Sequence, residues 1–263
     1  MEKCQNSVMS NSKLSVVIIT LNEEANIARC LNSVQKVADE IIVLDSGSTD
    51  KTMEICKNYN VDFNSTDWKG YSETKNTANS LARNEYILSL DADECLDDEL
   101  AIEISELKKR GFNGAYSLNR LTNYCGKWIY FSGWNPDWKI RLFPKETVKW
   151  NNAIVHEELM LPKEILIRKL NGRLLHYSYT STADHQQRAD KYSVLTANKY
   201  AKQGKKASFL SPMIGSIGRF LSMYILKLGF LDGKSGFQIA YISAKSNALK
   251  YRELNKINKF KRE

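Results

Sequence analysis

The sequence predicts an α/β protein built on a doubly wound, mostly parallel sheet, with a smaller mixed region after it and a helical C-terminal extension. Apolar, β-branched runs alternate with helical patterns over residues 13–110, which favours βαβ units with right-handed crossovers. Over residues 111–180 the apolar runs are shorter and lie between aromatic, turn-rich segments, and over residues 181–263 the pattern is helical. We therefore expect one domain in two parts at 13–180, followed by an extension.

The first predicted strand is Leu14 to Thr20. Its unbroken β-branched run is typical of a strand that is covered on both faces in a parallel sheet. Apolar residues at helical spacing follow, with Asn22 as the expected N-cap. The other expected elements are strands at 40–44, 61–63, 86–91, 115–118, 139–143 and 165–167, and helices that begin near Thr49, at Tyr71, near Asp97, at Thr182, near Ile214 and near Gly236.

The strand that ends at Asp91 leads into three carboxylates, Asp91, Asp93 and Glu94. Side chains alternate in an extended segment, so Asp91 and Asp93 are expected to point the same way and to repel each other. A cation between them would relieve this repulsion, and hard divalent ions such as Mg²⁺ or Mn²⁺ prefer carboxylate oxygens. The alternative is that these acids only begin the next helix, which is the better interpretation for the acids at 97–99.

Polar clusters follow three of the predicted strands, at Thr20 to Glu23, Asp45 to Asp50 and Asp91 to Glu94. Ligands of doubly wound sheets bind outside the carboxyl ends of the strands, so these clusters are expected to converge. No GxGxxG motif follows the first strand, which disfavours a dinucleotide cofactor. The same loop is not the glycine-rich, lysine-containing loop that is usual in a nucleotidyltransferase.

The segment from Asn123 to Trp138 is rich in aromatic residues. Such side chains either form a core or present rings on which sugars stack, and the sequence leaves both interpretations open. Its aromatic residues are Tyr124, Trp128, Tyr130, Phe131, Trp134 and Trp138.

The positive charge of the chain is concentrated near its C-terminus. Residues 199–263 contain 14 Lys and Arg against 3 Asp and Glu, a net charge of +11, which leaves −3 for residues 1–198. Two lysine-rich amphipathic helices in this part predict docking on an anionic membrane surface. The alternatives are a solvated surface packed on the main domain and a dimer contact. Nucleic acid is disfavoured, because basic charge is its only support and the aromatic-rich segment at 123–138 lies elsewhere in the chain.

Several features favour a cytoplasmic protein that is peripheral on the inner face of the cytoplasmic membrane. The five cysteines include no CxxC pair, which fits a reducing compartment and argues against a zinc site or a disulfide framework. Residues 1–12 lack an apolar signal core, so we expect no export. The apolar run at 209–228 is interrupted by Pro212, Arg219 and Lys227, so no membrane span is expected.

Three segments resemble the signature motifs of the inverting GT-A glycosyltransferases of family 2. In chain order they are residues 15–24 (SVVIITLNEE), residues 42–50 (IVLDSGSTD) and Asp91-Ala92-Asp93. Later segments resemble the bacterial subgroup that adds a hexose to the lipopolysaccharide inner core. These are residues 135–143 (NPDWKIRLF), 155–158 (VHEE) and 228–233 (LGFLDG). The resemblance implies a GT-A fold, with a donor part at 13–110, an acceptor part at 111–180 and a basic helical extension at 181–263.

The resemblance also implies where the nucleotide binds. The loop after the first strand would cradle the base and ribose, and Asp45 would accept a hydrogen bond from the uracil. Asp50, or the helix N-terminus beside it, would have a secondary part. The residues expected to bind the nucleotide sugar in these two loops are Thr20, Asn22, Glu23, Asp45, Ser46 and Asp50.

The aspartates of the DxD motif have distinct implied roles. Asp91 would contact the ribose or a metal-bound water, and Asp93 would ligate a divalent metal ion, Mn²⁺ or Mg²⁺, on the diphosphate. His156 is a candidate third metal ligand, or it orients the catalytic base. Lys75 matches a basic position that faces the nucleotide, although a solvated helix charge is the alternative, and Arg141 is expected to pair with a phosphate.

An inverting displacement requires one general base on the face of the sugar opposite the leaving group. The Glu-Asp pair of many relatives is absent here, so the expected base is Glu157, with Glu158 and then Asp137 as the other candidates.

The leading interpretation, which the resemblance implies, is a metal-dependent, inverting hexosyltransferase. Its expected donor is a UDP-sugar, UDP-glucose in the first place, and its expected acceptor is a lipid-linked saccharide such as lipopolysaccharide core. One alternative is a glycosyltransferase that acts on another cell-envelope glycan or on a peptide. A second is a catalytically silent membrane scaffold that still binds a nucleotide sugar.

Overall fold

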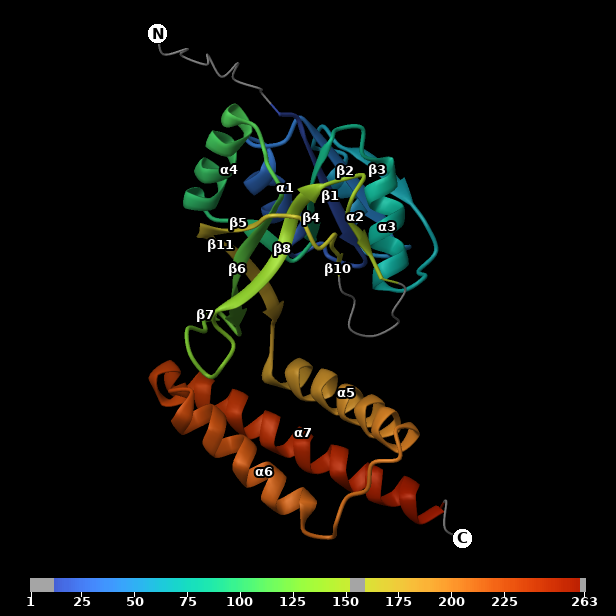
Figure 1. Ribbon diagram of the computed structural model, residues 1–263, viewed down its shortest axis with the longest axis vertical. Coiled ribbons are helices and arrows are strands. Elements are labelled where there is room, and N and C mark those ends of the chain that lie inside the picture. Colours follow the sequence, from blue (N-terminus) through green and yellow to red (C-terminus); the bar gives the residue numbers. More distant parts are fainter. Residues whose placement is uncertain (1–11, 152–158, 261–263) are drawn as a thin grey trace. The chain divides into compact units, whose positions relative to one another are not determined.

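A computed structural model describes residues 12–151 and 159–260, which fold into two compact units (Figure 1). The first unit contains residues 1–120 and 137–176, and the second contains residues 121–136 and 177–263. The sequence placed 121–136 in the acceptor part of the main domain. In the structure this segment belongs to the helical unit, because its aromatic side chains pack there.

A mixed sheet with the strand order β3-β2-β1-β4-β8-β6-β11-β5 forms the first unit (Figure 1). Its parallel half contains β1 (Leu14–Thr20), β2 (Glu40–Asp45), β3 (Asp62–Ser65) and β4 (Tyr86–Asp91). The connecting helices are α1 (Ile27–Val34), α2 (Thr52–Cys56) and α3 (Tyr71–Leu81). The predicted α/β architecture with a mostly parallel doubly wound sheet is therefore confirmed.

Strand β1 is buried along its whole length because both of its faces are covered. Val16 and Ile18 point into one core cluster, which includes residues of α1 and of α4 (Asp98–Arg110). Val17 and Ile19 point into a second cluster, which includes Ala78 of α3. The period-two alternation of a strand thus explains why the run has no polar face.

The mixed half of the sheet begins where β8 (Asp137–Pro144) pairs antiparallel with β4. Strand β6 (Ala115–Tyr124) pairs antiparallel with β8, and β11 (Ile167–Tyr179) pairs antiparallel with β5 (Glu94–Leu96). Short strands complete the β structure: β7 (Lys127–Trp128) pairs with β6, and β9 (Lys149–Trp150) pairs with β10 (Leu159–Met160).

Two local predictions differ from the structure. Helix α1 begins at Ile27 with Asn26 as its N-cap, whereas Asn22 has a positive φ of 55° and uses its side chain to accept a hydrogen bond from the backbone N–H of Thr49. Strand β11 is 13 residues long, although only 165–167 was expected. Its basic and polar side chains on partly exposed positions concealed the alternation in the sequence.

The second unit is mainly helical. Its helices are α5 (Thr182–Lys202), α6 (Ser211–Leu221), the π-helical segment η1 (Ser222–Leu226), the 3-10 segment η2 (Gly229–Asp232) and α7 (Gly233–Phe260). The helical nature predicted from Thr182 onward is confirmed.

Two aromatic residues of the segment at 123–136, Tyr124 and Trp134, contribute to the core of this second unit. Tyr124 is fully buried and meets Trp134, Tyr179 and His185 in edge-on or tilted ring contacts, with centroids 5.3–5.8 Å apart. Burial lowers the pKa of His185 to about 4, so this histidine is a neutral core residue at physiological pH. Tyr124 and Trp134 are therefore core residues, which is one of the two interpretations that the sequence left open.

Asp232 is a buried carboxylate that fixes residues 127–132 to the helices. Its oxygens accept hydrogen bonds from the backbone N–H groups of Tyr130 and Phe131 and from the hydroxyl of Ser132, at 3.1, 3.1 and 2.8 Å. The ammonium group of Lys127 donates to its backbone carbonyl at 2.7 Å. The LGFLDG segment singled out in the sequence thus has a structural role in this unit.

We expect Asp232→Ala to lower the free energy of unfolding by about 3 kcal/mol, because two backbone N–H groups and one hydroxyl lose a buried acceptor. Urea unfolding monitored by near-UV circular dichroism measures the change. The exposed carboxylate Asp67 provides the control, since Asp67→Ala should change stability by less than about 0.5 kcal/mol. Equal effects of the two substitutions would contradict the assigned role of Asp232.

Candidate functional site

The carboxyl ends of three neighbouring strands bring the predicted polar clusters together. In the parallel register Thr20 lies beside Asp45, and Ile19 lies beside Asp91. Strands β2, β1 and β4 therefore end at the same edge of the sheet, each in a polar residue. The convergence expected from the strand pattern is present in the structure.

The loops after β1 and β2 are joined by reciprocal hydrogen bonds. Asp45 accepts from the backbone N–H groups of Gly47 and Ser48, at 3.0 and 2.8 Å, and from the Ser48 hydroxyl at 2.5 Å. Gly47 has a φ of 89°, which the turn requires and a residue with a side chain rarely adopts. The Ser48 hydroxyl also accepts from the backbone N–H of Asn22 at 2.8 Å. Asp45 therefore shapes its own turn, and its contact with uracil stays a prediction.

Asp50 connects the start of α2 to the first loop. Its carboxylate accepts from the hydroxyl and the backbone N–H of Thr52, at 2.6 and 3.0 Å, and from the backbone N–H of Glu24 at 3.0 Å. Burial acts to raise the pKa of Asp50, but these hydrogen bonds outweigh it and lower the pKa. The backbone N–H of Glu23 is held in turn by the hydroxyl of Thr52 at 2.9 Å. Asp50 thus positions the loop through backbone contacts.

Two buried hydroxyl groups at this edge have no hydrogen-bond partner among the described residues. They are the side-chain oxygens of Thr20, the last residue of β1, and of Ser46, which directly follows β2. Buried polar groups in folded proteins are normally paired. Both residues belong to the predicted nucleotide-binding set, and their free hydroxyls fit a polar ligand at this position.

Asp91, the last residue of β4, is held between two buried cations. One oxygen lies 2.9 Å from the ammonium nitrogen of Lys75, and the other lies 2.8 Å from a guanidinium nitrogen of Arg141. Lys75 is only 2% exposed, and its ammonium also lies 4.7 Å from the ring centroid of Trp150. The alternative that Lys75 is a solvated helix charge is therefore wrong.

Glu94 is fully buried and extends this ion cluster. It accepts from Arg141 at 2.6 Å, from Arg120 at 3.3 Å and from the backbone N–H of Asp91 at 3.2 Å. Arg120 in turn lies 2.8 Å from Asp137. Neither the burial of Glu94 nor the part of Arg120 was expected, because no local pattern distinguishes a buried acid from the exposed acids that follow it.

The cluster keeps Asp91 ionised. Burial alone would raise its pKa, but the positive charges of Lys75 and Arg141 outweigh that effect and hold the pKa well below its usual range. The two neighbouring acids therefore do not need a metal ion to offset their repulsion, as the sequence argument assumed. Asp91 and Asp93 also do not lie on one strand: β4 ends at Asp91 and Asp93 lies in a turn, where strand alternation no longer applies.

Asp93 has its own partner, His176 of β11. The imidazole Nε2 lies 3.2 Å from a carboxylate oxygen of Asp93. Two ligands at right angles on a divalent ion, each about 2.1 Å from it, are separated by about 3.0 Å, so this pair has the spacing of two adjacent metal ligands. His176 was not expected at the site, since it lies 83 positions after Asp93 and no motif connects the two.

The described residues contain no group of three or more His, Cys, Asp or Glu side chains that could hold a metal ion. A metal that is shared with a diphosphate needs only one or two protein ligands, and Asp93 with His176 fits that arrangement. His156, which was the third ligand expected from the sequence, lies outside the described residues. The metal assignment of Asp91 and Asp93 stays a prediction.

Asp137 is the one candidate base that lies within the described residues, because Glu157 and Glu158 are outside them. It pairs with Arg120 at 2.8 Å and with Lys139 at 3.1 Å. Burial acts to raise its pKa, but these two cations outweigh it and lower the pKa. A carboxylate with a lowered pKa is a weaker base.

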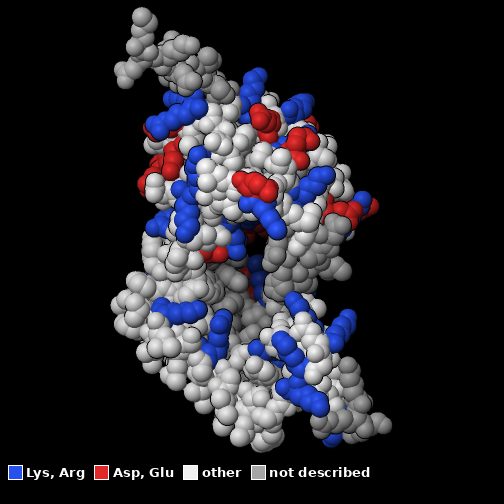
Figure 2. Space-filling model, viewed as in Figure 1, with Lys and Arg blue, Asp and Glu red and all other residues white. Residues whose placement is uncertain are grey.

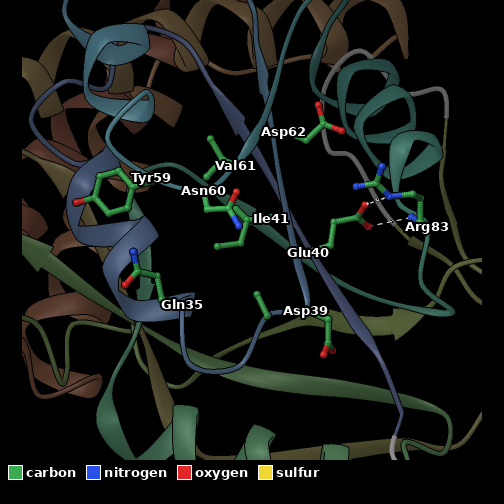
Figure 3. A pocket seen from close by; sticks show the side chains of 10 residues that line it. Gln35, Asp39, Glu40, Ile41, Tyr59, Asn60, Val61, Asp62 and Arg83 are labelled. Carbon is green, nitrogen blue, oxygen red and sulfur yellow. Dashed lines mark hydrogen bonds and ion pairs between the residues drawn. The ribbon is translucent and has the colours of Figure 1, made fainter.

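A surface pocket of the first unit lies at the opposite end of β2 (Figure 3). Strand β2 begins at Glu40, which lines the pocket, and ends at Asp45. Glu40 forms an ion pair with Arg83 and accepts from the hydroxyl of Ser15, both at 2.5 Å. These contacts tie the start of the sheet to the end of α3, and the pocket is separate from the polar edge.

Comparison with known proteins gives one family. Residues 15–180 match the model of the family described as "Glycosyl transferase family 2". An uncharacterized glycosyltransferase of Rickettsia typhi is 34% identical over 258 residues, which cover 94% of this chain and 88% of that protein. The lipopolysaccharide core biosynthesis glycosyltransferase LpsC of Rhizobium meliloti is 26% identical over 249 residues, which cover 88% and 90% of the two chains.

Two solved structures match this chain at lower sequence identity than these relatives. The S. aureus TarS 1-349 structure in complex with UDP has a TM-score of 0.42 and 13% identity, and the match covers 95% of this chain and 92% of that one. Glucosyl-3-phosphoglycerate synthase of Mycobacterium tuberculosis, solved with Mn²⁺ and UDP, has a TM-score of 0.35 and 23% identity, with 43% and 44% covered.

The ion cluster predicts how stability changes with pH. Because the pKa of Asp91 is lower in the folded than in the unfolded protein, its ionised form adds stability above the unfolded pKa, near 4, and this contribution is lost as the pH falls through the folded pKa. Asp91→Asn should therefore be less stable than wild type at neutral pH, and the difference should shrink on acidification. Urea unfolding in steps from pH 7 to about pH 3 measures it; a pH-independent difference would contradict the cluster.

Proposed function

This chain is a glycosyltransferase that belongs to family 2, and we propose that it transfers a hexose, with inversion, from a UDP-sugar to a lipid-linked saccharide. The observation that carries the proposal is the polar edge of the sheet, where Asp91 is fixed between Lys75 and Arg141 beside the Asp93–His176 pair. UDP-glucose is the proposed donor, as expected from the sequence resemblance.

The two loops at this edge would bind the nucleoside. The hydroxyls of Thr20 and Ser46 are buried without partners among the described atoms, so a nucleotide that approaches them can supply the missing hydrogen bonds. Asn22 and Asp50 hold the two loops in register through backbone contacts. Such preorganisation lowers the entropy cost of binding, because the loops are already in place.

Lys75 and Arg141 supply fixed positive charge near the site proposed for the diphosphate. Negative charge builds on the leaving nucleoside diphosphate as the bond to the anomeric carbon breaks, and preorganised cations stabilise it. When bound at Asp93 and His176, a divalent ion would act there as a Lewis acid. The family makes such an ion a reasonable cofactor, and the spacing of the pair supports Mn²⁺ or Mg²⁺.

Glu157 is the proposed general base. The lowered pKa of Asp137 and its pairing with Arg120 and Lys139 make it the weaker candidate, because a base must be free to take the proton of the acceptor hydroxyl. Glu158 is the neighbouring alternative.

The acceptor proposed here rests on two sequence similarities. Residues 135–143 and 228–233 resemble the subgroup that modifies the lipopolysaccharide core, and the similar protein LpsC carries lipopolysaccharide core biosynthesis in its name. Another cell-envelope glycan, or a peptide, is the alternative acceptor.

The donor can be tested without knowing the acceptor. We expect slow, metal-dependent release of UDP from one member of a panel of UDP- and GDP-sugars, with Mn²⁺, with Mg²⁺ and with chelator. Asp93→Ala should reduce the release at least about 100-fold and weaken Mn²⁺-dependent UDP binding measured by calorimetry. Asp98→Ala, which removes an exposed carboxylate five residues along the chain, is the matched control and should leave both unchanged. Absence of release and of metal-dependent binding would contradict the proposed donor and metal.

The base is tested by comparing two isosteric variants. Glu157→Gln should lower transfer to the acceptor by about 1,000-fold while UDP-sugar binding is kept, because only proton removal is affected. Asp137→Asn should lower transfer much less, and any loss should be accompanied by lower stability, since its partners are Arg120 and Lys139. Turnover near wild type in Glu157→Gln would move the base to another residue.

A further inference from the structure

Helix α6 presents an apolar stripe that no other described residue covers. Ile214 is 61% exposed, and Met213 and Ile217 are 55% and 54% exposed. At 3.6 residues per turn the members of the stripe fall within a sector of about 100° around the helix axis. They are Leu210, Met213, Ile214, Ile217 and Leu221.

The stripe faces away from the helix that packs on α6. Gly215 lies on the opposite side of α6, where an added Cβ would contact Asn247 and Tyr251 of α7 at 2.8 and 2.9 Å. The contact that Gly215 makes with α7 therefore lies on another side of α6 than the stripe. A soluble helix normally buries its apolar side against its neighbour, whereas the side chains of this stripe remain about half exposed among the described residues.

Further exposed apolar side chains lie in the elements that follow α6. Leu226 is 78% exposed in η1, and Phe230 and Leu231 are 47% and 53% exposed in η2. On α7, Phe237 and Tyr241 are about half exposed and stack with ring centroids 6.3 Å apart. A tyrosine such as Tyr241, with an apolar ring and a polar hydroxyl, is typical of the boundary between lipid and water.

Basic side chains surround this surface. Lys227, Lys234 and Lys245 are exposed, and the last two lie on the face of α7 that carries Phe237 and Tyr241. On the face shown in Figure 2, Lys and Arg predominate over the helical unit, whereas both signs of charge appear over the first unit. Residues 199–263 carry a net charge of +11.

We propose that the α6 stripe, η1, η2 and the first turns of α7 form a docking surface for an anionic lipid bilayer. The apolar side chains would enter the boundary of the acyl region while the lysines contact the headgroups. A second copy of this chain is disfavoured as the occupant, because it would bring the same positive charge against the surface. Among the described residues no single helix is long and apolar enough to span a membrane. By length and composition only, one pair of helices is, namely Ser211–Leu226 with Gly229–Lys259, and this pair is bent by 72°.

Flotation of the full-length protein with vesicles tests the proposal without measuring activity. Wild-type protein should float with vesicles of phosphatidylethanolamine and phosphatidylglycerol, and much less with phosphatidylcholine vesicles. Replacing Ile214 and Ile217 together by Ser should weaken binding to the anionic vesicles at least about tenfold, because two exposed side chains no longer gain from burial. Lys234→Gln should weaken it about fivefold, and added salt should reduce that difference.

The matched control is Ile102→Ser in α4, since Ile102 is also 61% exposed but lies in the first unit. This variant should float like wild type. The proposal is overturned if wild-type protein fails to float with either vesicle, or if the Ile214 and Ile217 double variant floats as well as wild type. It is also overturned if sedimentation velocity shows a dimer that the double variant dissociates, since the surface would then be a contact between copies.

Discussion

The buried ion cluster around Asp91 and Glu94 is the constraint on which the first unit depends. Charges removed from water must be paired, and leaving one of them without its partner is strongly destabilising. Here the partners come from α3, β6 and β8, through Lys75, Arg120 and Arg141. The parallel and the antiparallel halves of the sheet are therefore tied together at the point where β4 meets β8. The polar edge exists in its observed form because these three cations are balanced by three carboxylates, Asp91, Glu94 and the Asp137 that pairs with Arg120.

This arrangement gives the site rigid charges and leaves specific groups available. Asp91 is fully engaged by the chain's own cations, whereas Asp93 interacts with His176 in a pair whose spacing fits adjacent metal ligands. The hydroxyls of Thr20 and Ser46 are buried without partners among the described residues. Strong pairing on one side and unused polar groups on the other are what a site needs to bind and stabilise a charged ligand.

The second unit solves a different physical problem. Its core is built from aromatic rings around Tyr124 and is fixed by the buried carboxylate of Asp232, so its fold does not require the apolar stripe of α6. Exposing that stripe to water is unfavourable, at roughly 25 cal/mol for each Å² of apolar surface. A bilayer that covers the stripe would remove this cost, and its anionic headgroups would neutralise the surrounding lysines.

The sequence by itself determined the parallel half of the fold and the position of its polar edge. Leu14 to Thr20 is apolar without interruption, and strand polarity then requires Thr20, Asp45 and Asp91 to meet at one edge, because parallel strands end on the same side. These features follow from local patterns and chain direction. Tertiary structure alone decided the partners: Asp91 pairs with Arg141 and Asp93 with His176 across 50 and 83 residues of chain. It also decided that Lys75 is buried and that the α6 stripe is uncovered, because an amphipathic helix has the same sequence pattern whether or not something packs on it.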